Sequence, residues 1–415
     1  MPIEAGFWIG SIVLKTRLII AASLLCASAH APLMAKTISI SATAEAQEKL
    51  QEALIEAEPG DVVELGAGTY VLTDGLSLDV DNVTVRGAGN DKTVLSFKGQ
   101  RGAGEGLLVT SDGVTLRDFA VEDTKGDGIK SKGADNIVYR NMRVEWTGGP
   151  KETNGAYGIY PVSSKNVLID GAIVKGASDA GIYVGQSQYI IVRNSQAMQN
   201  VAGIEIENCY DADVYHNISK HNTGGILVFD LPNLPQQAGR NVRVFENIVS
   251  DNDEPNFAPK GNIVAGVPTG TGVMVMANNN VEVFRNIIKN NGTANVLITA
   301  YPNKFDDKNY VPTGQNVWVA ENLHGKAGFA PDFEGGKTLA AAFGGSIPEV
   351  MWDGLTMAPG SVVVNDRVGV MSLGYTKQGQ GVADAKPSLV KIASTTAKKR
   401  LPKIVLPKEM EARAK

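Results

Sequence analysis

The sequence predicts an all-β fold, a single-stranded parallel β-helix with an N-terminal capping helix. Two series of short segments recur between about residues 82 and 322, in a unit of roughly 23 residues that insertions lengthen in places. The first series begins or ends with asparagine and comprises segments 136–141, 166–171, 189–194, 241–247 and 280–286. The second begins with glycine and comprises segments 128–130, 158–160, 181–184, 203–207, 225–229 and 272–276.

These segments have the features of strands. Each is short, rich in β-branched residues and alternating, and Gly, Asn or Asp residues bound it. No helical pattern of useful length lies between them, so helices cannot connect parallel strands. We therefore expect one coil per repeat, with each strand stacked in parallel on its equivalent in the next coil.

The composition suits a solenoid. Among 415 residues there are 46 glycines for the turns, while only 6% are aromatic and 43% are hydrophobic. The formal net charge is -5, and the repeats contain no basic run, so nothing indicates a nucleic-acid partner. A polyanionic partner stays open because local patches matter more than the total charge.

The N-terminus predicts export. Lys15 and Arg17 precede the apolar stretch 18–29, and small residues follow, which is typical of a cleavable secretory signal. We expect a signal peptide over residues 1–35, cleavage between Ala29 and Ala35, and a periplasmic or secreted protein without a membrane span. A retained anchor is the alternative, since residues 7–14 are also apolar. Cleavage leaves Cys209 as the sole cysteine, so no intramolecular disulfide can form.

The rest of the chain divides into four parts. Residues 36–80 contain one amphipathic helix, over 43–57, and we expect a cap and first coil there. Residues 81–330 form the repeats, in a solenoid of about nine or ten coils. Residues 331–375 end the solenoid, and residues 376–415, rich in Lys, Ala and Pro, predict a loosely ordered tail.

Four insertions interrupt the repeats, at residues 146–157, 230–240, 251–271 and 301–315. They contain Pro, Gly, Asn and Lys, as surface loops do. Insertions in a solenoid tend to lie on one face, which is often the binding face.

The glycine-led strands predict a wall of polar side chains. Residues two apart on a strand share a face, so Glu205 and Glu207 both point outward, about 7 Å apart in the open. The same register stacks two outward columns: Lys130, Tyr160, Tyr183 and Glu205, and beside them Lys132, Glu207 and Phe229. Tyrosine rings pack on sugars and carboxylates accept their hydroxyl hydrogens. The alternative is a set of ordinary solvated positions.

This wall suggests chemistry on a polysaccharide. For a uronic-acid polymer, Lys130, Lys132 and Lys151 could neutralise charge, while Tyr160 or Tyr183 acts as acid or base. Glu205 and Glu207 suit hydrolysis instead, because their spacing leaves room for a water. Further acid candidates are Asp179 and Asp230, and further binding candidates are Trp146 and Phe229.

Other recurring residues predict structure rather than chemistry. Asn141, Asn194, Asn217, Asn247, Asn286 and Asn322 recur at one turn position, where asparagine tolerates left-handed φ and can form a ladder. Met274 and Met276 could bind copper(I), but we favour an apolar strip under the 251–271 loop. No metal site is predicted, and the cofactor stays open, calcium included, although no calcium-repeat consensus is present.

Five longer runs carry a resemblance: EWTGGPKETNGAYGIYP (145–161), SDAGIYVGQS (178–187), VAGIEIEN (201–208), GGILVFDLP (224–232) and NFAPKGNIV (256–264). Through them, residues 37–360 resemble a family of exported bacterial parallel β-helix repeat proteins that has no assigned activity. The resemblance implies a right-handed β-helix in the periplasm or at the surface.

More distantly, the chain looks like the pectate-lyase-like group with its carbohydrate-binding and sugar-hydrolase repeats. That likeness is of fold, and fold does not fix function. Mannuronan epimerases carry an Asp-Pro-His-Asp motif, whereas residues 229–233 here offer the aspartate without the histidine. A copper-site maturation protein has similar repeats, but His and Cys are scarce in this chain.

The sequence thus predicts an exported β-helix that binds a polysaccharide along the wall from Lys130 to Phe229. An extended form of this hypothesis is that the protein also cleaves or modifies the polysaccharide. Lyase, epimerase and hydrolase chemistry stay open. The alternative is a non-catalytic envelope protein that holds a protein partner on the same face.

Overall fold

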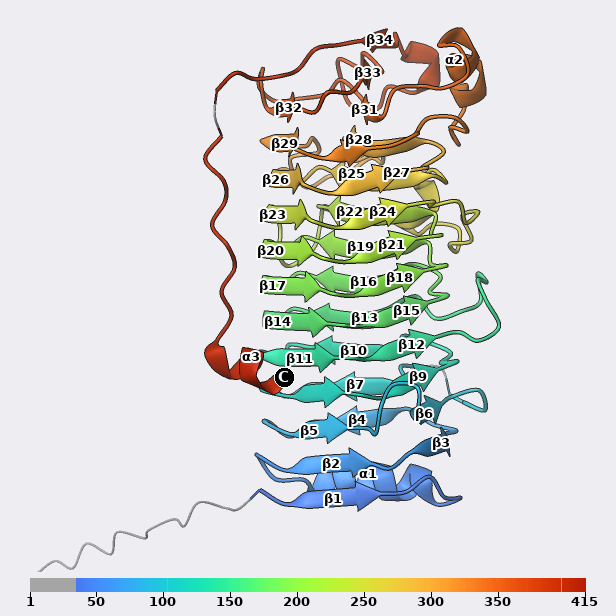
Figure 1. The fold of residues 1–415 in the computed structure, drawn as a ribbon, viewed down its shortest axis with the longest axis vertical. Helices are drawn as coiled ribbons and strands as arrows, with labels where there is room; N and C mark the ends of the chain where they lie inside the picture. The colour runs from blue at the N-terminus through green and yellow to red at the C-terminus, as the bar shows by residue number, and fades with distance from the viewer. Residues whose placement is uncertain (1–34, 103, 397) are drawn as a thin grey trace, which may run out of the picture. The chain divides into compact units, whose positions relative to one another are not determined.

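The computed structural model describes residues 35–415, apart from 103 and 397. The expected signal peptide, residues 1–35, lies outside the described residues except for Ala35. Within the described part, the chain winds into stacked coils that form three long sheets, A, B and C (Figure 1). No helix among these residues has the length and apolar character needed to cross a membrane.

Sheet A contains the asparagine-bounded strands, and every neighbouring pair in it is parallel. Its strands, in spatial order, are β1 (Thr37–Ile40), β2 (Val62–Leu65), β5 (Thr84–Arg86), β8 (Thr115–Arg117), β11 (Ile137–Arg140), β14 (Lys165–Asp170), β17 (Gln188–Arg193), β20 (Tyr210–Tyr215), β23 (Arg240–Phe245), β26 (Asn279–Phe284), β29 (Val317–Ala320) and β32 (Val362–Val364).

Sheet B contains the short third strand of each coil, which the sequence repeats did not predict. Its strands are β3 (Gly68–Val71), β6 (Thr93–Ser96), β9 (Ala120–Glu122), β12 (Arg143–Glu145), β15 (Ile173–Lys175), β18 (Gln196–Met198), β21 (Ile218–Lys220), β24 (Ile248–Ser250), β27 (Ile287–Lys289) and β30 (Leu323–His324).

Sheet C contains the glycine-led strands and carries the candidate site. Its strands are β4 (Leu76–Leu78), β7 (Leu107–Val109), β10 (Ile129–Lys132), β13 (Tyr157–Val162), β16 (Ala180–Gly185), β19 (Ala202–Glu207), β22 (Gly224–Phe229), β25 (Thr271–Met276), β28 (Ala294–Thr299), β31 (Val350–Trp352), β33 (Val370–Ser372) and β34 (Ser388–Leu389). Only β34 runs antiparallel, to β33.

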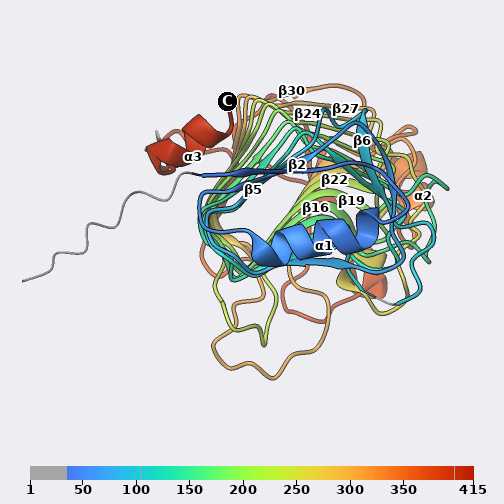
Figure 2. The same cartoon turned by 90° about the horizontal axis from the view of Figure 1, so that it is seen from below.

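The predicted coil stacking is confirmed. Between residues 81 and 330 sheet A has nine strands, β5 to β29, which agrees with the nine or ten coils predicted there. Strands β1 and β2 precede them, and β32 adds one rung past residue 360. Alternate residues of each strand point inward, and the interior is filled mainly by Val, Ile and Leu. Helix α1 (Ala46–Glu56) covers the first coils through Ala46, Leu50, Ala53 and Leu54, as the predicted cap does (Figure 2).

Two asparagine ladders stabilise the turns. Asn217, Asn247, Asn286 and Asn322 are stacked. From Asn247 onward, each side-chain oxygen accepts the backbone amide and the side-chain amide of the preceding rung. The predicted structural role is thus confirmed for these residues. Asn141 and Asn194 have φ of 51° and 52° and bind neighbouring aspartates instead. A second ladder was missed: Asn200, Asn222, Asn252 and Asn291.

The C-terminal residues, predicted as a loose tail, form a strap across sheet A. The segment runs back along the solenoid and ends in helix α3 (Lys408–Arg413) beside β11 (Figure 1). Ile404, Leu406 and Met410 are buried against Val138, Leu168 and Ile191. The remaining helical segments are α2 (Gly336–Ala342), η1 (Ile263–Gly266) and η2 (Val382–Asp384).

Candidate active site

The predicted columns of the wall are confirmed by the register of sheet C. Lys130 pairs with Tyr160, and Tyr183 pairs with Glu205. In the second column Lys132 pairs with Val162, Gly185 with Glu207, and Glu207 with Phe229. Because parallel stacking repeats one register along the sheet, side chains from five successive strands, β10 to β22, come together on one flank.

The prediction that this wall is open to solvent is wrong from Tyr183 to Phe229, whereas Lys132 is exposed as expected. Glu205 is 1% exposed, Glu207 is 6% exposed, and Phe229 is fully buried. The cause is the insertions, which fold over the outer face of sheet C (Figure 2). A strand periodicity distinguishes inward from outward positions, but it does not show that a loop from another coil covers the outward ones.

Two insertions make this cover. From the 251–271 insertion, Val264 and Val267 pack in one cluster with Leu227 and Met274, so the predicted apolar strip under this loop is confirmed. Asn262 of the same insertion donates its side-chain amide to the Asp179 carboxylate at 3.0 Å. From the 301–315 insertion, the Tyr310 hydroxyl donates to the backbone carbonyl of Asp230 at 2.5 Å.

Under this cover lie three neighbouring acids, Asp179, Glu205 and Glu207. Both carboxylate oxygens of Glu205 are buried, and neither has a hydrogen-bond partner among the described residues. A buried polar group without a partner costs about 1–3 kcal/mol, and an ionised one costs more. The carboxyl group of Glu205 therefore resists ionisation.

The surroundings shift all three acids in the same direction. Burial, and then the charges of Asp179 and Glu207, hold the pKa of Glu205 well above its usual range. Burial raises the pKa of Asp179 to about 7, assisted by the charge of Glu207. Burial likewise raises the pKa of Glu207 to about 7. Near neutral pH the cluster thus contains a protonated acid beside carboxyl groups that can accept a proton.

Three tyrosines form the adjoining part of the wall. The rings of Tyr157, Tyr160 and Tyr183 lie 4.4–4.9 Å apart between centroids. The Tyr183 hydroxyl donates to Glu207 Oε1 at 2.6 Å, which holds the carboxylate in place. Burial and the nearby carboxylates raise the pKa of Tyr183, so its phenol stays protonated and does not act as a base. Tyr157 was not among the predicted site residues.

The predicted lysines, Lys130, Lys132 and Lys151, form no ion pair with the three acids. Lys130 forms ion pairs with Glu105 at 2.9 Å and Asp127 at 3.5 Å, and its ammonium lies 4.9 Å from the centre of the Tyr160 ring. Lys132 and Lys151 are exposed. None of these three is ion-paired with an acid of the cluster.

Two further predictions need revision. Trp146 packs in the interior of the solenoid, and its indole nitrogen donates to the Thr124 carbonyl at 2.8 Å, so it is not on a binding surface. Asp230 is buried where β22 ends, and its carboxylate accepts the Gly239 amide at 2.7 Å. Burial raises the pKa of Asp230 to about 6, but its contacts are those of a turn.

Residues 35–415, as described, contain no cluster of His, Cys, Asp or Glu fitted to a metal ion.

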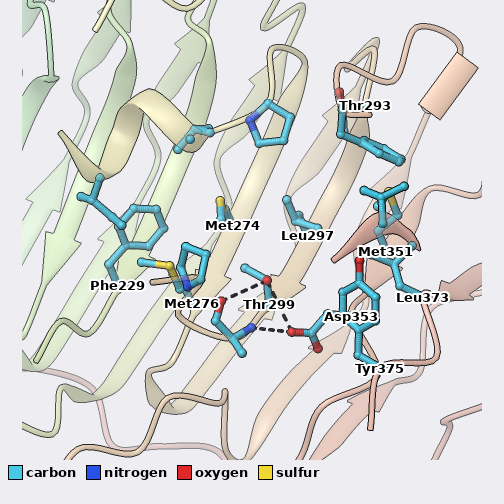
Figure 3. A pocket seen from close by; sticks show the side chains of 18 residues that line it. Phe229, Met274, Met276, Thr293, Leu297, Thr299, Met351, Asp353, Leu373 and Tyr375 are labelled. Carbon is cyan, nitrogen blue, oxygen red and sulfur yellow. Dashed lines mark hydrogen bonds between the residues drawn. The ribbon is translucent and has the colours of Figure 1, made fainter. Parts of the chain in front are cut away.

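Further along sheet C, beyond Phe229, lies a cavity of about 240 Å³ that none of the three acids lines. Figure 3 shows side chains of β22, β25, β28 and β31 around it, with Asp353 and Tyr375 at one side. We call it the sheet C cavity. Sequence reasoning missed it, because its walls come from segments as distant as η1 and residues 373–382.

Comparison with known proteins agrees with this architecture. Residues 105–257 match the family model described as a right handed beta helix region. The A-module of the Azotobacter vinelandii mannuronan C-5 epimerase AlgE4 is similar over 75% of this chain and 88% of that chain, with 15% identity and a TM-score of 0.53. An alginate lyase from Paenibacillus sp. str. FPU-7 is similar over 70% and 97%, with 17% identity and a TM-score of 0.48. No curated protein sequence matches. The chain therefore has the right-handed parallel β-helix fold, which is the fold of the pectate-lyase-like group.

Proposed function

We propose that this protein is a polysaccharide-acting enzyme that hydrolyses a glycosidic bond of a neutral glycan, with Glu205, Glu207 and Asp179 as its reacting groups. The observation that carries the proposal is the Glu205 carboxyl, whose oxygens are both buried without a partner. Stability does not explain such a group, because a hydrophobic side chain of similar size would avoid the cost. Strongly shifted acids that cluster on one face are instead typical of catalytic sites.

The protonation states divide the roles. Glu205, which stays protonated, can donate a proton to the glycosidic oxygen as that bond breaks. Glu207, oriented by Tyr183, can take a proton from the water that attacks the sugar carbon. The two residues are two apart on β19, and their side chains are therefore about 7 Å apart, in the range left for a water by inverting glycosidases.

The charges favour a neutral substrate over a uronic acid. Lyase and epimerase chemistry needs a cation near the sugar carboxylate. Lys130 and Lys132 both lie three rungs from the two reacting glutamates in register. Lys130 is already engaged by Glu105 and Asp127, and Lys132 is exposed to solvent. A uronate placed beside Asp179 and Glu207 would meet negative charge as these groups ionise.

The fold supports a polysaccharide as the substrate class. The epimerase similar to this chain is named for mannuronan, and the same solenoid can present a long groove to a polymer. Access requires movement, because the acids are covered. Asn262 holds the 251–271 insertion to Asp179, and we propose that this contact opens to admit the glycan. Export, expected from residues 1–35, would place the enzyme outside the cytoplasm.

A reducing-end assay tests the proposal. Purified protein is incubated with a panel of neutral and uronic-acid polysaccharides, and Glu205→Gln is compared with Glu152→Gln, an exposed control. We expect new reducing ends from a neutral polymer, lowered about 10²-fold or more in Glu205→Gln and unchanged in the control. Unsaturated products from a uronic-acid polymer would indicate a lyase instead. Glycan or protein binding without turnover would favour the non-catalytic alternative.

A further inference from the structure

The sheet C cavity continues the columns that carry the acids. Phe229, at its edge, pairs with Glu207 of the preceding strand, and Met276 pairs with Phe229. In the neighbouring column, Leu297 pairs with Met274. Stacked strands are about 4.8 Å apart, so the lining residue Phe229 lies roughly one strand spacing from Glu207. None of the three acids lines the cavity, and the fully buried Leu227 and Phe229 lie between the carboxylates and it. A molecule that occupies both places therefore requires these two side chains to move.

The outer face of sheet C changes from acidic at Glu205 and Glu207 to apolar at the cavity. Met274, Met276, Leu297, Met351 and Leu373 form its floor and sides (Figure 3). Its roof includes Ile263 and Val267, from the same insertion whose Asn262 covers Asp179. One short segment thus covers both the acids and the cavity.

Most polar groups in the cavity wall are already used within the protein. The Thr293 hydroxyl donates to the Thr269 carbonyl and accepts the Asp332 amide. The Thr299 hydroxyl donates to the Ala300 carbonyl at 3.1 Å.

The carboxylate of Asp353, in the same cavity wall, is likewise hydrogen-bonded within the protein. Asp353 accepts the backbone amides of Ala300 at 2.6 Å and Leu355 at 2.8 Å. A sugar ring buried here would leave most of its hydroxyl groups unpaired, at a cost of about 1–3 kcal/mol each. The cavity is therefore suited to an apolar group.

We propose that the sheet C cavity binds an apolar substituent, an alkyl or acyl chain, of the glycan that is cleaved at Glu205 and Glu207. This inference rests on the proposed function, and it narrows the substrate to sugars that carry such a chain. Tyr375 lies across the cavity from Phe229 in Figure 3, so it faces the far end of the chain and not the link to the sugar. Apolar cavities of about 150 Å³ hold one benzene ring, so this one has room for a chain of roughly eight carbons.

Titration with n-alkyl β-D-glucopyranosides tests the inference. The probes are the methyl, butyl, hexyl and octyl glucosides, used below the concentration at which micelles form, and binding is measured by calorimetry. We expect affinity to rise about fourfold per methylene up to the octyl chain. Leu297→Trp fills the cavity and should weaken octyl glucoside binding at least tenfold. Leu323→Trp, on an exposed site of sheet B, should leave binding unchanged.

Each outcome is decisive. Affinity independent of chain length in the wild-type protein overturns the inference, and this measurement needs no variant to fold. So does unchanged octyl glucoside binding in a Leu297→Trp protein whose circular dichroism shows a folded solenoid.

The proposed hydrolysis is tested separately. Glu205→Gln should lose turnover but keep the dependence on chain length. If that dependence holds and no glycan is cleaved, the cavity assignment stands for a bound glycan and hydrolysis fails.

Discussion

Side-chain alternation predicts the face on which Glu205 and its neighbours lie, but not their burial or their contacts. The repeat placed Glu205, Glu207 and Tyr183 on one flank of the sheet, and the register confirms this. The burial of these residues was not predictable, because it depends on insertions 50 to 100 residues further along the chain. The contact of Tyr183 with Glu207 also depends on rotamers, which a repeat does not specify.

Replacing Glu205 by glutamine should change how stability depends on pH. The folded-state pKa of Glu205 lies above its unfolded value of about 4.3, so the wild-type protein loses stability as the pH rises from there. Glutamine does not titrate. The free energy of unfolding of Glu205→Gln, relative to wild type, should therefore increase by about 1.4 kcal/mol per pH unit.

Urea denaturation between pH 4.5 and 6.5 measures this slope. Glu152→Gln, at an exposed position, should differ from wild type by the same amount at every pH. A flat difference for Glu205→Gln would show that Glu205 ionises normally in the folded protein.

Removing the Tyr183 hydroxyl should raise the pKa of Glu207. The hydroxyl donates to the carboxylate and stabilises its charged form, which opposes the effect of burial. A hydrogen bond to a charged group contributes about 1.5–3 kcal/mol, so Tyr183→Phe should raise this pKa by about 1–2 units from its value near 7. Carboxyl ¹³C NMR measures the titration, with Tyr189→Phe as the control on sheet A. A lowered or unmoved pKa contradicts the assignment.

The strands and turns follow from the sequence more completely than the site does. Asparagine recurring at one turn position predicts a ladder, and Asn217, Asn247, Asn286 and Asn322 form one. The ladder from Asn200 to Asn291 was missed, because its members follow the short sheet B strands, whose repeat is too weak to align. Likewise, insertions could be located as loops, but the face that each loop packs on depends on its own apolar residues.

Removing one rung of the first asparagine ladder should lower the free energy of unfolding. In Asn247→Ala, the backbone amide of Asn217 and the backbone carbonyl of Val214, both buried, lose their hydrogen-bond partners. At about 1–3 kcal/mol for each group, the free energy of unfolding should fall by about 2–6 kcal/mol. Urea denaturation measures the change, and Asn309→Ala, on an exposed loop, should stay within about 0.5 kcal/mol of wild type. An equally small effect at Asn247 would mean that water replaces the rung.

The strap was not predictable because its few apolar residues show no period. Ile404 and Leu406 alternate with the exposed Val405, yet the segment forms no strand. It is instead held by separate contacts, including the Ile404 amide to Asp213 at 3.1 Å and the ion pair of Glu411 with Arg193 at 2.7 Å. These partners lie far away in sequence, so a repeat analysis cannot find them.

Shortening the buried Met410 side chain should release the strap without unfolding the solenoid. Met410→Ala removes contacts with sheet A that contribute about 2–5 kcal/mol, which is large for a segment of this length. Trypsin should then cleave after Lys403 and Lys408 at least tenfold faster, while the thermal transition of the solenoid moves little. Val405→Ala, at an 80% exposed position, is the control. Unchanged cleavage would show that other contacts suffice to hold the strap.

The return of the strap to β11 also has a consequence for biosynthesis. Residues 404–414 leave the ribosome long after Val138, Leu168 and Ile191, yet they cover the apolar strip that these three residues form. During synthesis that strip has no cover. A nascent or prematurely terminated chain therefore exposes this apolar strip, which chaperones can bind until the strap is synthesised and covers it.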